Sequence, residues 1–260
     1  MGVTPGLGVV LPPPDPATRR PRFRVGDVVR TVLADAATCP PLGPSQLRAL
    51  RAMAQCRTAA LGGHVDRCTR CGHERLPSYN SCRNRHCPSC QGFAARVWVA
   101  TRVERILPVP HFHVVFTLPA PLRRLFGVDA AGMYDRLFAA VATTLRVLAE
   151  KRLGVQLGVT AVLHTWNQDL GYHPHIHAIV TGGGLDADGR WKATPVGYLL
   201  PQPWLAAFFR GAMVRALRTA YADQTLPVPP EWAQPKPFRA AMRRLYQERW
   251  VVYAKRPFGG

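Results

Sequence analysis

Two kinds of hydrophobic pattern alternate along the second half of the chain. Apolar residues at every second position, or in short unbroken runs, predict strands in HFHVVFTL, GVTAVLHTW, HIHAIVTG and WVVYA. Apolar residues three and four apart predict helices over Met133–Lys151, Trp204–Ala222 and Phe238–Glu248. This order of elements is typical of an α+β sandwich, in which helices cover one antiparallel sheet.

The first half of the chain has a different character. Its start is rich in Pro and Gly and has no periodicity, which is typical of a disordered leader. Short helices are predicted near Asp27–Leu33, Pro44–Ala60 and Phe93–Leu107. The stretch between Cys56 and Cys90 has too few apolar residues to fold without cross-links. We therefore expect a leader at 1–23, a Cys/His module at 24–107 and a sheet domain at 108–260.

The charge of the chain predicts a polyanionic partner. Lys and Arg number 34 against 15 acidic residues, for a net charge of +19, and 30 of the basic residues are Arg. The guanidinium fork can hold phosphate through two donors, so nucleic acid is the expected partner. The chain has neither an apolar run long enough to span a membrane nor a secretory signal at its start, so we predict a cytoplasmic protein. Thiols stay reduced there, so clustered cysteines indicate metal rather than disulfides.

Two CxxC pairs predict a zinc site. Fifteen residues separate Cys68-x2-Cys71 from Cys87-x2-Cys90. Each pair presents two thiolates to one ion, and two pairs complete a tetrahedral S4 site. The metal would then supply much of the folding energy of this segment.

Further donors near these pairs allow a second zinc site. The candidate ligands are Cys56, His64, Cys82 and His86. The alternative is that these side chains support the first site or pack in a core. Residues 40–110 contain 11 Arg against 3 acidic residues, and Arg83 and Arg85 lie inside the cluster. A loop that is held by zinc and carries arginine side chains predicts a contact with DNA phosphates.

A second constellation of histidines lies on a predicted strand. Side chains two apart on a strand share a face, so His175 and His177 can bind one ion while Ile176 points into the core. A third ligand would come from the neighbouring strand or turn, where Gln168, His164 and Asp169 are the candidates. For His111-Phe112-His113 we expect hydrogen-bonded structural histidines or substrate contacts rather than a second metal.

These residues together resemble a known family. CRTAALGGHVDRCTRCGHERLPSYNSCRNRHCPSCQ is similar to the zinc-binding front of rolling-circle, two-tyrosine transposases of the IS-ninety-one type. HFHVVFTLP, HTWNQDLGYHPHIHAIVTGGGL and WVVYAKRPFGG resemble stretches of the nuclease core in the same family. The resemblance runs from about residue 24 to the end of the chain.

The resemblance implies a His-hydrophobe-His (HUH) endonuclease fold and a bacterial DNA transposase associated with the nucleoid. Its sheet would hold one Mg²⁺ or Mn²⁺, with His175 and His177 as ligands and Gln168 as the favoured third. In such enzymes a tyrosine hydroxyl attacks a phosphodiester of single-stranded DNA, and the ion polarises the scissile phosphate. The products are a 5′-phosphotyrosine link and a free 3′-hydroxyl.

One feature of the family is missing from these residues. The catalytic tyrosines form a Tyr-x3-Tyr pair, and no two of the seven tyrosines have that spacing. We therefore expect no catalytic nucleophile in this chain, which would be a truncated or decayed transposase that is inactive in strand transfer. An alternative is a zinc-ribbon nucleic-acid-binding protein without chemistry. A weaker alternative is a hydrolytic zinc site at the histidines, with Asp169 as the base.

Overall fold

The computed structural model describes residues 22–258 except 36, 38, 76, 170, 196 and 198. Most of the expected leader, and the last two glycines of the resemblance, lie outside these described residues. The chain divides into two compact units, Met1–Ile106 and Leu107–Gly260, and each is described by itself. Among the described helices, none combines the length and the apolar character that crossing a bilayer requires.

The N-terminal unit begins with two helices that pack closely. They are α1, Val25–Ala34, and α2, Pro44–Gln55. Gly26 allows the close approach, since a Cβ at this position would lie 2.7 Å from the carbonyl oxygen of Met53. The predicted extension of the second helix to Ala60 is wrong. The helix ends at Gln55 because Cys56 turns to an extended backbone and Arg57 has a φ of 60°.

The rest of this unit is a small hairpin and a third helix. A short 3-10 turn, η1 (Ala59–Leu61), leads into β1 (Gly63–His64), which pairs antiparallel with β2 (Ser78–Tyr79). Helix α3 covers Pro88–Val103, so it starts five residues earlier than predicted. Pro88 fits the first helical turn, where no amide donor is needed. This early start places Cys87 at the N-cap and Cys90 in the first turn.

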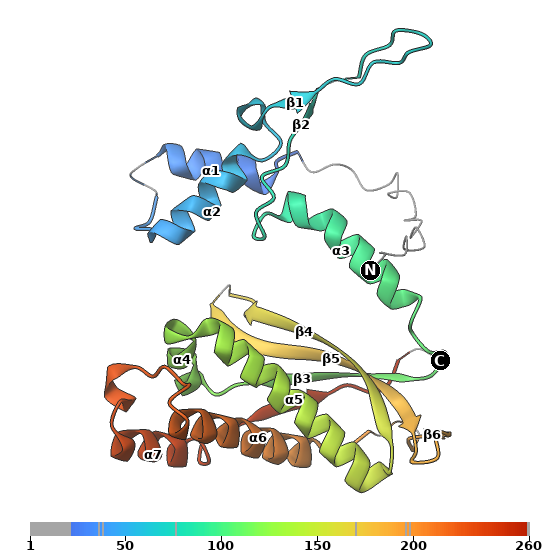
Figure 1. The fold of residues 1–260 in the computed structure, drawn as a ribbon, viewed down its shortest axis with the longest axis vertical. Coiled ribbons are helices and arrows are strands. Elements are labelled where there is room, and N and C mark those ends of the chain that lie inside the picture. Colours follow the sequence, from blue (N-terminus) through green and yellow to red (C-terminus); the bar gives the residue numbers. More distant parts are fainter. Residues whose placement is uncertain are drawn as a thin grey trace, which may run out of the picture. The chain divides into compact units, whose positions relative to one another are not determined.

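The C-terminal unit is built on one antiparallel sheet. Its strands are β3 (His111–Thr117), β4 (Gln156–Trp166), β5 (Tyr172–Leu185), β6 (Trp191–Ala193) and β7 (Val251–Ala254). The order is β4-β5-β3-β7, and β6 pairs with the far end of β5. The α+β fold with an antiparallel sheet, predicted from the strand and helix patterns, is confirmed (Figure 1).

Helices cover one face of this sheet. They are α4 (Arg123–Val128, after the turn η2, Ala120–Leu122), α5 (Ala130–Leu153), α6 (Gln202–Ala222) and α7 (Pro235–Arg244, after η3, Pro230–Trp232). Alternate strand residues such as Phe116 and Ile176 are fully buried against them, and Phe116 meets Phe209 edge to face. The residues between them, including His113 and His177, lie on the other face and keep contact with solvent.

Candidate metal centres

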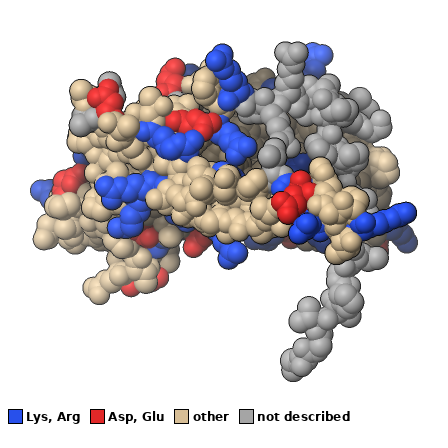
Figure 2. Space-filling view, turned by 90° about the horizontal axis from the view of Figure 1, so that it is seen from above, with Lys and Arg blue, Asp and Glu red and all other residues tan. Residues whose placement is uncertain are grey.

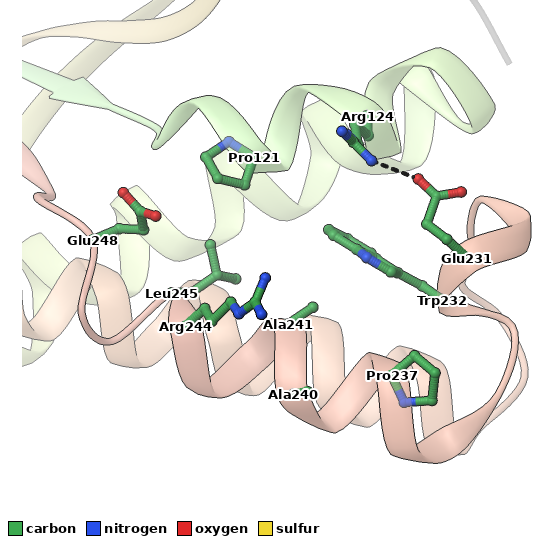
Figure 3. A pocket seen from close by; sticks show the side chains of 10 residues that line it. All are labelled: Pro121, Arg124, Glu231, Trp232, Pro237, Ala240, Ala241, Arg244, Leu245 and Glu248. Carbon is green, nitrogen blue, oxygen red and sulfur yellow. Dashed lines mark hydrogen bonds and ion pairs between the residues drawn. The ribbon is translucent and has the colours of Figure 1, made fainter.

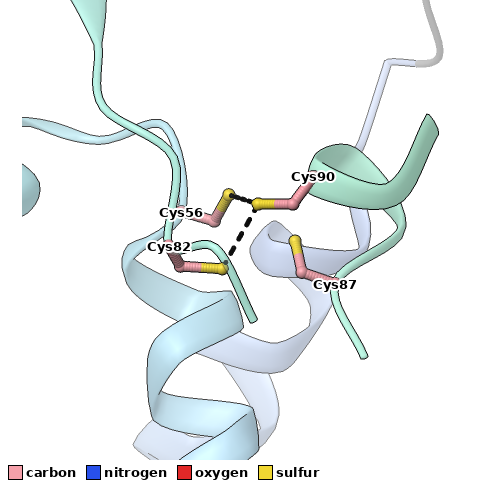
Figure 4. Close-up of side chains that lie close together, drawn as sticks. All are labelled: Cys56, Cys82, Cys87 and Cys90. Atoms are coloured by element: carbon pink, nitrogen blue, oxygen red, sulfur yellow. Dashed lines mark hydrogen bonds between the residues drawn. The ribbon is translucent and has the colours of Figure 1, made fainter. Parts of the chain in front are cut away.

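Four cysteine thiols meet in the N-terminal unit. Cys56 follows α2, Cys82 lies in the loop before α3, and Cys87 and Cys90 lie at the start of α3 (Figure 4). Their sulfur atoms all lie within 4.8 Å of one another. The Sγ of Cys90 is 3.4 Å from that of Cys56 and 3.5 Å from that of Cys82. A backbone hydrogen bond of 3.1 Å from Arg57 to Asn80 holds the two loop segments together.

This cluster fits a tetrahedral zinc ion. A Zn–S bond of about 2.3 Å puts two ligand sulfurs roughly 3.8 Å apart, close to the separations found. Burial raises the pKa of Cys56 to about 12. Burial acts the same way on Cys90, but the neighbouring thiols of Cys56, Cys82 and Cys87 outweigh it and lower its pKa to about 7. A lowered pKa favours the thiolate, which is the form of cysteine that binds a metal ion.

The structure groups the cysteines differently from the predicted CxxC pairing. Cys68 and Cys71 lie at the exposed tip of the hairpin that extends β1 and β2, where Arg67 pairs with Glu74. They lie outside the four-thiol cluster, because this hairpin carries them away from the start of α3. Of the predicted ligands Cys68, Cys71, Cys87 and Cys90, the structure brings only Cys87 and Cys90 together, and it groups them with Cys56 and Cys82.

The structure also separates the four candidate ligands of the second zinc site. Cys56 and Cys82 belong to the cluster, whereas His64 lies in β1 and His86 is exposed in the loop before α3, its ring 3.3 Å from the Nε of Arg85. Arg83 and Arg85 are both exposed on that loop, so they remain free to meet a ligand. Basic and acidic side chains are interspersed on the face seen in Figure 2.

Three histidines form a second cluster, on the open face of the sheet. His164 of β4 pairs directly with His175 of β5, and His177 lies two residues further along β5. Residues that are direct partners across antiparallel strands point to the same face. One ring nitrogen from each of the three lies within 4.8 Å of those of the others, close enough to share an ion.

Hydrogen bonds orient two of these imidazoles. The Nδ1 of His175 is 2.6 Å from the carbonyl oxygen of His173, which can only accept, so Nδ1 carries the proton. The Nδ1 of His177 is 2.7 Å from the Nε2 of His113. Both bonds leave Nε2 available to a metal ion, in the way that outer partners orient metal-binding histidines.

The electrostatics of the cluster favour neutral rings, the form that binds a metal. Burial lowers the pKa of His177 to about 4, and the facing His164, His175 and His113 act in the same direction. Burial also lowers the pKa of His164, with His175 and His113 adding to it.

The structure separates the three candidates for the third ligand. His164 lies within β4, opposite His175, whereas Gln168 and Asp169 lie in the exposed turn between β4 and β5. Strand β5 begins at Tyr172, so this turn is shorter than predicted and is closed by a 3.0 Å bond from the Asn167 amide to the Gly171 carbonyl. Sequence reasoning left His164 open as a competitor, and the strand register now brings it into the group.

Two residues next to the histidine cluster were not predicted as ligands from the sequence. His113 was expected to be a hydrogen-bonded structural histidine, and its bond to His177 agrees with that expectation. Arg123, at the start of α4, was not singled out. Its guanidinium lies 2.8 Å from the Nδ1 of His173 and brings a positive charge beside the histidines.

A separate hollow lies between η2, η3 and α7 (Figure 3). Trp232 faces it beside the ion pair of Arg124 and Glu231, whose atoms are 2.8 Å apart, and Arg244 and Glu248 line the other side. Its lining contains no histidine or cysteine. The two clusters described above are therefore the candidate metal centres of the described residues.

Two family profiles match the chain. Residues 28–118 match a transposase zinc-binding domain, and residues 158–260 match a domain described as a putative transposase. The first range contains all four clustered cysteines, and the second contains His164, His175 and His177.

Two curated proteins are similar over much of the chain. A putative transposase, y4qJ of Sinorhizobium fredii, is 42% identical over 225 residues, which are 84% of this chain and 56% of that protein. The transposase for insertion sequence element IS801 of Pseudomonas savastanoi pv. phaseolicola is 40% identical over 144 residues, 54% of this chain and 34% of that protein. The chain thus spans about half or less of the length of these relatives.

Among solved structures, the conjugative relaxase TrwC in complex with oriT DNA, in a copper-bound form, aligns with 51% of this chain and 62% of its own, at 15% identity and a TM-score of 0.30. The family rests instead on the two profiles and the two curated relatives. The chain belongs to the IS-ninety-one type family of insertion-sequence transposases that carry this zinc-binding domain.

Proposed function

We propose that this chain supplies the DNA-binding and metal-binding parts of a rolling-circle transposase that acts on single-stranded DNA. The observation that supports this most directly is the group of His164, His175 and His177 on the open face of an antiparallel sheet. An open face leaves room for a DNA strand to reach an ion held there. The surplus of arginine over acidic residues favours a phosphate-rich partner.

The three imidazoles would hold one divalent ion. When bound, the ion would polarise a phosphate oxygen and offset the charge that develops in the transition state. Imidazole ligands suit transition metals better than Mg²⁺, which prefers oxygen ligands. Of the two ions that the family resemblance implies, Mn²⁺ is therefore the better fit.

The protein groups around this site have distinct roles in the proposal. His113 and the carbonyl of His173 keep two imidazoles in the orientation that presents Nε2. Arg123 lies beside His173 and can hold a phosphate oxygen next to the ion. These groups would position a phosphodiester for in-line attack.

The nucleophile has to come from elsewhere. The family resemblance implies a Tyr-x3-Tyr pair, and residues 1–260 contain none. We therefore propose that this chain by itself binds metal and DNA in the bacterial cytoplasm but does not complete strand transfer.

The N-terminal module, residues 24–107, would be a DNA-binding domain whose fold depends on zinc. Zinc at Cys56, Cys82, Cys87 and Cys90 would join the end of α2 to the start of α3. The loop between Cys82 and Cys87 would then present Arg83 and Arg85 to the DNA backbone. Residues 108–260 would form the nuclease domain.

Titration of the purified chain with Mn²⁺ by calorimetry tests the proposal. The chain should bind one Mn²⁺, and His164→Ala, His175→Ala and His177→Ala should each remove that binding while the fold, measured by circular dichroism, is kept. Gln168→Ala is the control and should bind normally. Loss in Gln168→Ala but not in His164→Ala would return Gln168 as the third ligand.

The same titration distinguishes the transposase proposal from the alternative of a zinc-ribbon protein. A zinc-ribbon protein without chemistry would hold zinc at the cysteines and show no Mn²⁺ binding that depends on histidine. If the three variants unfold instead, the histidines are structural and the nuclease proposal fails.

A further inference from the structure

The open face of the sheet continues from the histidines to an exposed tyrosine on the edge strand. In the pairing of β5, β3 and β7, Val115 lies opposite His177 on one side and opposite Tyr253 on the other. Direct partners on antiparallel strands point to one face, so the Tyr253 side chain lies on the same face as His177. Two strand spacings of about 4.8 Å separate their backbones by roughly 10 Å.

The exposure of Tyr253 has no explanation in the packing of the fold. Along β7, Val252 is only 6% exposed because it points into the core, whereas Tyr253 is 49% exposed. Val251, which shares the open face, is 38% exposed. The strand therefore places a large aromatic ring in solvent beside the metal-binding group.

Positively charged residues lie on both sides of the open-face residues that run from the histidines to Tyr253. Lys255 donates its backbone amide to the carbonyl of His113 at 3.0 Å, so it lies at the β7 side of the histidines. Arg123 lies on the other side, at His173. Cations that follow a backbone, combined with an exposed aromatic ring, are the features that bind single-stranded nucleic acid.

We propose that Tyr253 stacks on a nucleobase of the single-stranded DNA whose phosphate lies at the His164–His175–His177 site. This inference rests on the proposed function and adds to it a base-binding position on β7. The separation of about 10 Å suits a base close to the bound phosphate rather than a distant one. Every base has a flat π-face, so the contact favours single strands without selecting a sequence.

The experiment measures binding of a fluorescein-labelled oligothymidine of about 20 nucleotides to the full chain by fluorescence anisotropy, with Mn²⁺ present. Tyr253→Phe keeps the ring and should bind within about twofold of the wild type. Tyr253→Ala should weaken binding by about 5- to 150-fold, the range for loss of one stacked base. Tyr246→Ala, which removes another exposed tyrosine, is the matched control and should change binding little.

A second set of oligonucleotides locates the contact. Each carries one abasic site, moved stepwise along the strand. With the wild type, one position should weaken binding more than the others, and with Tyr253→Ala that difference should disappear. A merely structural role of the ring would lower affinity at all positions alike.

The outcomes separate this inference from the proposed function. If the wild type binds the oligonucleotide and Tyr253→Ala binds equally well, stacking is wrong and the DNA-binding proposal stands. If Tyr253→Phe loses as much as Tyr253→Ala, the hydroxyl rather than the ring makes the contact, and stacking is again wrong. If the wild type fails to bind, the proposed function fails and the stacking inference falls with it.

Discussion

His113 and His177 lie on neighbouring strands with the Nε2 of one 2.7 Å from the Nδ1 of the other, and their rings stack at 5.0 Å between centroids. The pairing matters because it leaves the Nε2 of His177 for a metal and fixes the ring in place. His113 belongs to an HxH motif of the same form as the proposed metal pair, and in the proposed site it would be the outer hydrogen-bond partner of a ligand. In this proposal the two HxH motifs of the fold would have different roles.

Removal of this outer partner should weaken the metal site without abolishing it. We expect His113→Ala to raise the dissociation constant for Mn²⁺ by about 10- to 100-fold, the usual effect of losing an orienting hydrogen bond. His113→Gln, which can still reach a ring nitrogen, should recover part of the loss. Calorimetric titration of the three proteins checks this, and equal affinities would show that the bond has no role in metal binding.

Zinc content should follow the four-thiol cluster rather than the two CxxC pairs. Cys56→Ser should lose the zinc and much of the helical signal of the N-terminal unit, because binding of a structural zinc supplies about 10–16 kcal/mol in small zinc modules. Cys68→Ser, at the exposed hairpin tip, should retain it. Elemental analysis and circular dichroism measure both effects. Zinc lost from Cys68→Ser but kept by Cys56→Ser would restore the CxxC pairing.

The hydroxyl pair of Tyr134 and Tyr172 should make stability sensitive to alkaline pH. Their oxygens are 2.9 Å apart, and burial, followed by the bond to Tyr134, raises the pKa of Tyr172 above its ordinary value of 10.0. A tyrosine whose pKa is raised in the fold contributes stability below its unfolded pKa and loses it as pH rises beyond that value. Above about pH 10 the wild type should therefore lose stability faster than Tyr172→Phe.

Thermal unfolding of both proteins between pH 8 and pH 11 gives this comparison. Other groups titrate in that range in both proteins, so only the difference between the two curves counts. Parallel curves would show that the Tyr172 hydroxyl ionises as easily in the fold as in the unfolded chain.

Close packing of α1 on α2 should depend on Gly26. A Cβ at this position would lie 2.7 Å from a backbone oxygen of Met53, which cannot move aside cheaply. Gly26→Ala should destabilise the N-terminal unit by about 1–3 kcal/mol. Gly92→Ala, in α3, is the control, since a Cβ there meets nothing within 4 Å and should be neutral or slightly stabilising. Chemical denaturation of the zinc-loaded chain measures both, and equal stability of the two variants would contradict the close approach.

Local pattern predicted much of this molecule. Alternation along HFHVVFTL and HIHAIVTG was enough to identify β3 and β5 and to put His175 and His177 on one face, because side chains alternate with a period of two. Helix ends were less well predicted. Cys56 and the left-handed Arg57 end α2 earlier than predicted, and α3 starts at Pro88, five residues earlier than predicted.

The sequence therefore determined which types of side chain are available at the two proposed centres. The tertiary structure decided which individual residues lie together in each. Clustered thiols and imidazoles are side chains that can bind a metal ion, and the sequence shows both kinds. Which ones meet depends on contacts between distant segments. The hairpin after β1 removes Cys68 and Cys71 from the cluster, while the register of β4 on β5 brings His164 to His175. Such pairings depend on how whole strands and loops pack, and no local spacing of residues encodes that.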